Sequence, residues 1–180
     1  MTDQIMAICS VEDIPEELVQ FEPRDVFNEV FLRFSVQLSE GDRLICEGSW
    51  APVVSSVEVL KKVAFQLVDN AIKYRASGRN LNFSVTFLEG DSEWEFLFQD
   101  NGIGISEKDR DRIFHVFERL NERDKTLGSG LGLSTCRKLL EKIGGSIEVK
   151  SSQSNVTIFS VKIPKSLGST VEPRRLERAS

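Results

Sequence analysis

Apolar residues recur at intervals of three and four over two stretches of the chain, and this spacing predicts two amphipathic helices. The first stretch, residues 23–34, opens with Pro23, which suits a first helical turn. Its apolar positions are Val26, Phe27, Val30, Phe31 and Phe34. The second stretch, residues 55–74, keeps the same spacing from Val57 to Tyr74 and is the stronger helix prediction.

Strict alternation of apolar and polar residues predicts two half-buried strands, at residues 81–87 and 94–98. Turn residues 89–92 lie between them, so we expect an antiparallel hairpin. Short strands or an irregular hairpin are predicted near residues 43–46 and 53–54, and two final strands at residues 146–150 and 157–163.

Two further helices are expected in the second half of the chain. Ser106 to Asp109 has the form of a capping box, so the following stretch is predicted to be a helix that carries Ile113, Phe114, Val116 and Phe117. The glycine-rich residues 128–133 open another helix that runs to residue 143, where Gly144 is expected to form a left-handed cap.

This order of elements predicts an α+β fold. We expect a two-layer sandwich, in which helices cover one face of a mixed, mostly antiparallel sheet. Residues 1–20 are expected to be a lead-in segment, and the stump of a dimerisation helix is one interpretation of it. Residues 21–164 are the folded domain, and residues 165–180 a disordered tail.

Composition narrows the class of protein. The chain has 180 residues and a net charge of −5, which gives no electrostatic footprint for nucleic acid. Its three cysteines are scattered, as in a reducing compartment. No stretch approaches the ~20 apolar residues of a membrane helix, and no signal peptide is apparent. We expect a soluble, cytoplasmic protein.

Three polar features could carry chemistry. Gln66, Asn70 and Lys73 form a polar stripe on one face of the second helix. The DNGIGI turn, residues 100–105, follows a predicted strand and places a carboxylate beside two glycines. The GSGLGL segment, residues 128–133, opens a helix, and free amides at a helix start favour phosphate. It lacks the lysine of a P-loop and the preceding strand of a Rossmann motif.

The order of these features, together with the paired Phe114 and Phe117, resembles the nucleotide-binding domain of sensor histidine kinases. These belong to the GHKL (HATPase) superfamily, which also contains gyrase, the heat-shock chaperone ATPase and the mismatch-repair ATPase. The segments VDNAIKY (residues 68–74), IFHVFERL (113–120) and GLGL (130–133) are most similar to kinases of the phytochrome-related and PAS-linked type. The resemblance covers residues 21–164 and implies a Bergerat-type ATP-binding fold.

The resemblance also implies roles for individual residues. Asp100 would accept a hydrogen bond from the adenine amine, and Asn70, together with Gln66, would ligate Mg²⁺. Residues 118–127 would form a lid whose cations contact phosphate. The implied catalytic residues are Asn70, Lys73 and Arg119. The implied ATP contacts are Asn70, Lys73, Tyr74, Asp100, Gly102, Gly104, Ile105, Arg123, Lys125, Gly128, Gly130, Leu131, Gly132 and Leu133.

Two departures from the family pattern stand out. Gln66 occupies the position of a usual asparagine, and residues 154–156 lack the glycine usual before the last strand. The chain has one histidine, His115, which the resemblance makes a packing or surface residue rather than a phosphoacceptor. The acceptor histidine is therefore expected on a separate domain or partner, with a response regulator downstream, and the isolated domain is expected to be a monomer.

Two alternatives to a histidine kinase domain exist. The fold could serve as an adaptor or phosphotransfer scaffold that no longer binds nucleotide. Gln66 and the glycine-free turn favour this slightly, but the intact motif residues weigh more heavily against it, namely Asn70, Asp100, Gly102, Gly104 and residues 128–132. An ATPase or serine kinase of the same superfamily is disfavoured by the paired phenylalanines and the Arg119-Leu120 ending.

Overall fold

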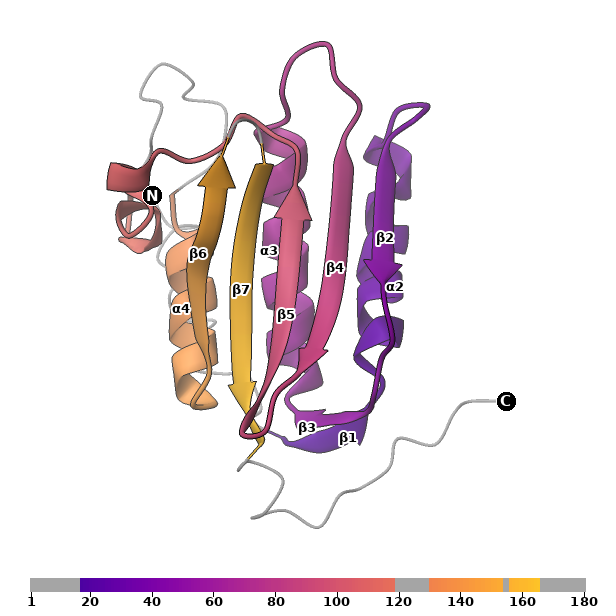
Figure 1. Ribbon diagram of the computed structural model, residues 1–180, viewed down its shortest axis with the longest axis vertical. Helices are drawn as coiled ribbons and strands as arrows, with labels where there is room; N and C mark the ends of the chain where they lie inside the picture. The colour runs from indigo at the N-terminus through magenta and orange to yellow at the C-terminus, as the bar shows by residue number, and fades with distance from the viewer. Residues whose placement is uncertain (1–16, 119–129, 154–155, 166–180) are drawn as a thin grey trace, which may run out of the picture.

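The computed structural model describes residues 17–118, 130–153 and 156–165, which form two layers (Figure 1). The helices are α2 (Pro23–Phe34), α3 (Val57–Lys73) and α4 (Gly132–Lys142), with short 3-10 turns η1 (Ser35–Gln37), η2 (Glu107–Asp109) and η3 (Arg112–Phe114). The strands are β1 (Val19–Phe21), β2 (Arg43–Glu47), β3 (Val53–Ser55), β4 (Asn82–Glu89), β5 (Glu93–Asp100), β6 (Ser146–Gln153) and β7 (Val156–Pro164).

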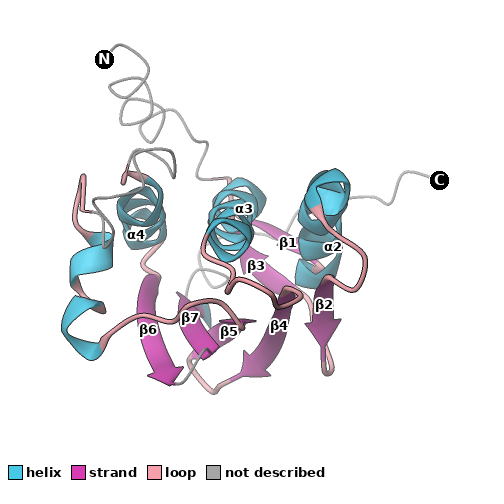
Figure 2. Cartoon of the chain, turned by 90° about the horizontal axis from the view of Figure 1, so that it is seen from above, coloured by secondary structure: helices cyan, strands magenta, loops and turns pink. Residues whose placement is uncertain are grey.

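Five strands form the main sheet in the order β2-β4-β5-β7-β6. β4 and β5 are the predicted hairpin, and β5 and β6 both pair antiparallel with β7. β2 is parallel to β4. The mixed, mostly antiparallel sheet predicted from sequence is confirmed, and α2, α3 and α4 all lie on one of its faces (Figure 2).

The short strands do not form a hairpin with each other. β2 joins the edge of the main sheet, whereas β3 pairs with β1 in a separate two-stranded sheet. Because β1 begins at Val19, the boundary expected between residues 20 and 21 falls inside a paired strand. Residues 1–16 and 166–180 lie outside the described residues.

The core fills the space between the helix layer and the sheet. α3 supplies its predicted apolar face, including Leu60, Val63 and Leu67, and the Ser56 side chain accepts a hydrogen bond from the Val59 N–H at its start. Gly144, at φ 67°, ends α4 in the predicted left-handed cap.

The prediction of a helix after Ser106 is wrong. The chain forms the two 3-10 turns η2 and η3 instead, and neither has a side-chain N-cap bond. The Asp109 carboxylate accepts hydrogen bonds from the Ser106 hydroxyl and from Arg112, so it does not cap a helix. Phe117 then takes a positive φ of 64°, which stops any helical continuation.

Among the described helices, none is both long and apolar enough to cross a membrane.

Phe27 is the centre of an aromatic cluster, and its removal should destabilise the fold. It is fully buried, with ring centroids 5.6 Å from Trp50 and 5.5 Å from both Phe96 and Phe98. We predict that Phe27→Ala lowers the free energy of unfolding by about 3–5 kcal/mol, measured by denaturant titration. Phe65→Ala is the control, because that ring is 43% exposed. A loss as large as that of Phe27→Ala would contradict the assignment.

Candidate functional site

The site begins with Asp100, the last residue of β5. Its Oδ1 accepts a hydrogen bond from the Gly102 N–H at 2.8 Å. Burial raises the pKa of this carboxyl above its ordinary value, and the Gly102 N–H opposes that shift only in part. Asp100 is therefore a largely desolvated acceptor with unused lone pairs, which is the kind of group found at ligand sites.

The turn after Asp100 lies unusually close to the end of α3. The Ile103 N–H donates to the Tyr74 carbonyl at 3.0 Å. A Cβ on Gly102 would stand 2.6 Å from that same carbonyl oxygen, so only glycine fits there. Gly104 has a φ of 79°, and Ile105 then packs against the core. The turn is thus fixed to the helix that carries the polar stripe.

Asn101 ties the other side of this turn to the loop that follows α3. Its Oδ1 accepts from the Asn82 N–H at 2.8 Å, and its Nδ2 donates to the Asn80 carbonyl at 2.9 Å. The loop is held in turn by Asp42, whose carboxylate accepts from the Leu81 N–H at 2.8 Å. A chain of hydrogen bonds therefore supports Asp100 from outside the site.

The polar side chains along α3 form hydrogen bonds and an ion pair with other side chains of the same helix. Gln66 Nε2 donates to Asn70 Oδ1 at 2.9 Å, and Lys73 Nζ contacts Asp69 Oδ2 at 2.5 Å. A carbonyl oxygen has two lone pairs, so Asn70 Oδ1 can still accept one further partner. Lys73 would have to leave Asp69 in order to contact a phosphate.

The start of α4 meets this stripe at Gly132. A Cβ on Gly132 would lie 2.2–2.4 Å from the amide group of Gln66, so the α4 start lies directly against this side chain of α3. α4 has no side-chain N-cap bond, and its first-turn amides keep the positive end of the helix dipole open. Leu131 is buried at the N-cap, Leu133 packs on the core, and the Gly130 carbonyl accepts from the Phe117 N–H at 3.1 Å.

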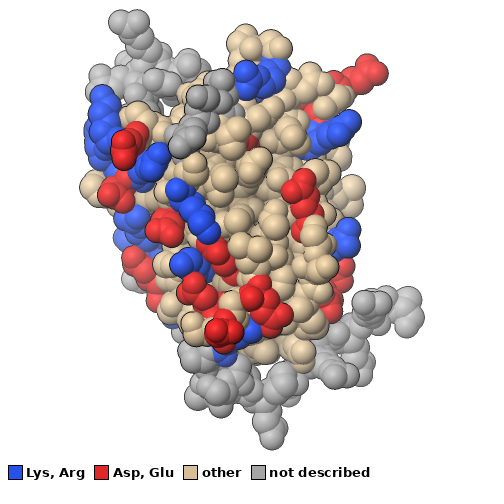
Figure 3. Space-filling view, in the orientation of Figure 1, with Lys and Arg blue, Asp and Glu red and all other residues tan. Residues whose placement is uncertain are grey.

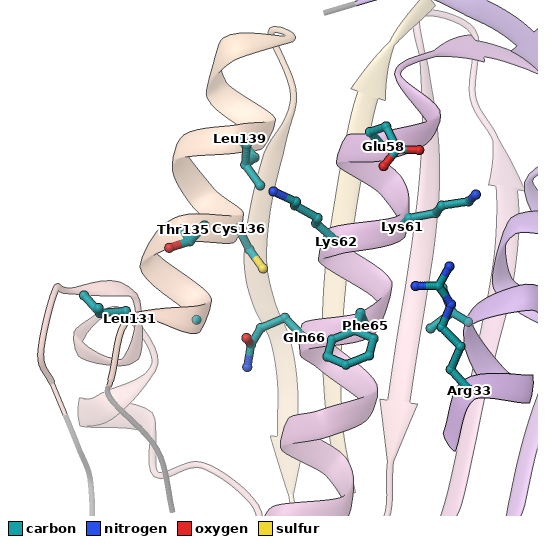
Figure 4. Close-up of a pocket in the computed structure, with 12 residues that line it drawn as sticks. Arg33, Glu58, Lys61, Lys62, Phe65, Gln66, Leu131, Thr135, Cys136 and Leu139 are labelled. Carbon is teal, nitrogen blue, oxygen red and sulfur yellow. The ribbon is translucent and has the colours of Figure 1, made fainter. Parts of the chain in front are cut away.

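A groove of about 450 Å³ runs over α3 between α2 and α4 (Figure 4). It contains Gln66, Leu131 and Gly132, but neither Asn70 nor Asp100 is in its lining. The groove therefore covers the side of the site at the α4 start and leaves out the Asp100 end.

Two residues at the site were missed from the sequence. Lys62, one turn before Gln66, extends from α3 toward α4 (Figure 4) and prolongs the polar stripe at a spacing of four, a signal that was available. Thr157 is 2% exposed on β7 and pairs directly with Asp100 of β5. No local pattern marks Thr157, because the pairing joins distant strands.

The predicted site extends into parts of the chain beyond the described ranges. Arg119, Arg123, Lys125 and Gly128 lie outside the described residues, as do residues 154 and 155 of the glycine-free turn. His115 follows η3 and is exposed. The remaining predicted residues meet around α3: the Asp100 turn contacts its C-terminal end, and the α4 start contacts Gln66.

This fold and site define a nucleotide-binding domain of the class shared by kinases and ATPases. Residues 56–167 match the family described as histidine kinase-, DNA gyrase B-, and HSP90-like ATPase, and the chain belongs to this family. Within that family, the proteins to which the chain is similar include sensor histidine kinases.

The phytochrome-like protein Cph1 of Synechocystis is 29% identical over 91% of the chain, and the sensor protein CiaH of Streptococcus pneumoniae is 31% identical over 91%. The chain spans only 22% and 37% of these two relatives. The catalytic domain of the histidine kinase ThkA is 28% identical with a TM-score of 0.69, covering 83% of this chain and 96% of that one.

Asn101 should position the Asp100 turn. We predict that Asn101→Ala weakens ATP binding by about 1 kcal/mol, roughly fivefold in Kd, because two hydrogen bonds that hold the turn are lost. The measurement is calorimetric titration. Asn82→Ala is the matched control, because only the backbone N–H of Asn82 contacts Asn101. Equal losses in the two variants would contradict a positioning role.

Proposed function

We propose that the chain binds Mg²⁺·ATP along α3 and presents the γ-phosphoryl group to a histidine on a separate domain or partner. This proposal rests on the arrangement around α3. The half-buried carboxylate of Asp100, which has unused acceptor capacity, lies at the C-terminal end of this helix, and the N-terminus of α4 lies against its polar stripe. An acceptor for a base and amides for phosphate are the two parts that a nucleotide requires.

The base would bind at Asp100. The ionised carboxylate can accept a hydrogen bond from the exocyclic amine of adenine, and the turn of Gly102 and Gly104 leaves room beside it. Thr157 pairs with Asp100 and could place its hydroxyl next to the same ring. Tyr74 is half-buried at the end of α3 and would line the pocket.

The metal would be held mainly by phosphate oxygens and water. Mg²⁺ commonly takes only one or two protein oxygens in such sites. The described residues contain no group of three or more His, Cys, Asp or Glu side chains suited to a metal, so a lone amide ligand fits. Asn70 Oδ1 supplies that oxygen, and Gln66 orients it or adds a second one. Bound Mg²⁺ would neutralise phosphate charge during transfer.

The phosphates would lie toward the α4 start. First-turn amides of α4 point to this region, and Lys73 and Lys62 supply cations from α3. Lys62 is exposed and has no ion pair within the described residues, so it can respond to a phosphate. Contacts from Arg119, Arg123, Lys125 and Gly128 stay predictions of the sequence.

We expect the acceptor histidine on a separate domain or partner, because the chain has one histidine, His115, which follows η3 and is exposed outside the α3 stripe. A response regulator is the expected downstream partner in a cytoplasmic phosphorelay. ThkA, whose structure shares this fold, has been solved in complex with the response regulator TrrA. We extend that pairing to this chain as part of the proposal.

An adaptor that has lost nucleotide binding is the second candidate. The contacts of Gln66 with Asn70 and of Lys73 with Asp69 favour it, because they occupy the groups that metal and phosphate would use. Titration of the chain with Mg²⁺·ATP separates the two functions. Binding at millimolar nucleotide or below supports the kinase domain, and no binding leaves the adaptor.

Asp100 gives the sharpest test of the base assignment. Asp100→Asn keeps an oxygen for the Gly102 N–H but removes the charge, so we predict about 2 kcal/mol weaker ATP binding. The free energy of unfolding without ligand should not fall, because the buried charge is itself unfavourable. Unchanged ATP affinity in calorimetric titration would refute the assignment.

The same carboxylate predicts a pH dependence. Since burial raises its pKa, Asp100 becomes protonated on acidification at a higher pH than an ordinary aspartate, whose pKa is about 3.9. Protonation removes the charged acceptor, so ATP affinity should fall as pH decreases through that raised pKa. The Asp100→Asn variant should not show this fall in ATP affinity at acidic pH. An equal fall in both proteins would mean that another group is responsible for it.

Asn70 should carry the metal dependence. We predict that Asn70→Ala lowers ATP affinity in Mg²⁺ at least roughly tenfold, the lower range for removing even a supporting group of a metal site. Affinity in EDTA should change much less. Titrations with and without Mg²⁺ check this, and equal losses under both conditions would show that Asn70 does not act through the metal.

A further inference from the structure

β2 forms an open edge of the main sheet. It pairs with β4 on one side, and no described strand pairs with its other side. The Arg43 N–H donates to the Leu81 carbonyl at 2.8 Å, so the backbone groups of Arg43, Ile45 and Glu47 point toward β4. By alternation, those of Leu44 and Cys46 point outward at the edge, where no residue in the described part of the chain is shown bonded to them.

The sequence of this edge is self-complementary. Arg43 and Glu47 stand two residues on either side of Ile45, on the same face of the sheet. A second β2 placed antiparallel about Ile45 would set each arginine opposite the glutamate of the other copy. The Leu44 and Cys46 backbones would form the hydrogen-bonded pairs, and the two Ile45 side chains would meet at a non-hydrogen-bonded position.

The exposed groups are free to make this pairing. Arg43 and Glu47 are both exposed, and neither has an ion pair with another described residue. Ile45 is 38% exposed on the sheet face opposite the helices. Figure 3 shows that face, where charges gather over the lower part and the middle of the strands is largely uncharged.

Charges on an edge strand often prevent edge-to-edge association. Here the two charges have opposite signs and are placed symmetrically, so the antiparallel register converts them into two attractive cross-strand pairs. A parallel register, or one slipped by one or two residues, would lose these pairs. The charges thus select one arrangement.

We infer that β2 is a self-association edge, through which a second copy of this chain extends the sheet about a two-fold axis at Ile45. The interface is isologous, as in most protein dimers. It is short, so the association is reversible and depends on concentration. The monomer expected from sequence would then be the dilute state, and the inference does not depend on nucleotide binding.

Disulfide trapping tests the register. In a Cys9→Ser, Cys46→Ser background, Ile45→Cys should form a disulfide-linked dimer under mild oxidation. Opposed Cα atoms at a non-hydrogen-bonded pair lie about 4.5 Å apart, within disulfide range. Leu88→Cys is the matched control, because Leu88 is similarly exposed, at 41% against 38%. Equal cross-linking at both positions would indicate random collision and overturn the inference.

Charge reversal tests the complementarity. In the Ile45→Cys protein, Arg43→Glu or Glu47→Arg should slow cross-linking roughly tenfold, because two attractive pairs become repulsive. Combining Arg43→Glu with Glu47→Arg should restore the cross-linking rate. If these residues only stabilised the fold of one chain, the combination would not restore it. Circular dichroism melting confirms that each variant folds.

Sedimentation velocity on the unmodified chain completes the test. Its average mass should rise toward a dimer at millimolar protein and fall again at high salt, which screens the pairs. A monomer at every concentration, as expected if a segment of the same chain covers the edge, overturns the inference. So does a double variant that cross-links no faster than the single ones.

Discussion

The site depends on the close approach of the turn after Asp100 to the last turn of α3. Gly102 permits this approach, because any side chain there would collide with the Tyr74 carbonyl. α3 buries its apolar face, which includes Leu60, Val63 and Leu67, in the core. Fixing its C-terminal end beside Asp100 therefore also fixes Asn70 relative to the carboxylate. A second contact, between Gly132 and the Gln66 side chain, places the start of α4 against the same helix.

The two ends of the site differ in whether their groups are already arranged for a nucleotide. At the base end, hydrogen bonds from Gly102 and Asn101 already hold Asp100 and its turn in place. At the metal and phosphate end, Asn70 and Lys73 are occupied by neighbours on their own helix. A nucleotide could thus dock its base on preformed groups and exchange partners only where its charge is greatest, where Mg²⁺ supplies the compensating energy.

Local patterns in the sequence were sufficient for α2, α3 and the β4–β5 hairpin, because periodicity and a short turn determine them. Pairing between distant segments was not visible locally. The parallel placement of β2 and the pairing of Thr157 with Asp100 both join strands far apart in the chain. The helix predicted after Ser106 failed for another reason, since the pattern does not show that Asp109 bonds to Arg112 instead of a backbone amide.

Asp100 also bears on the choice between kinase domain and adaptor. A carboxylate whose burial raises its pKa, with a backbone N–H as its one described hydrogen-bond donor, costs the folded state free energy. In an adaptor no bound ligand would compensate for this destabilisation, and a neutral or apolar residue at the end of β5 would stabilise the same hairpin. In a nucleotide site the unused acceptor capacity is what selects adenine. Local rules of stability are broken where function requires it, and Gly102, whose place beside the Tyr74 carbonyl admits no side chain, directs its N–H to that carboxylate. The physical balance therefore favours a domain that still binds ATP.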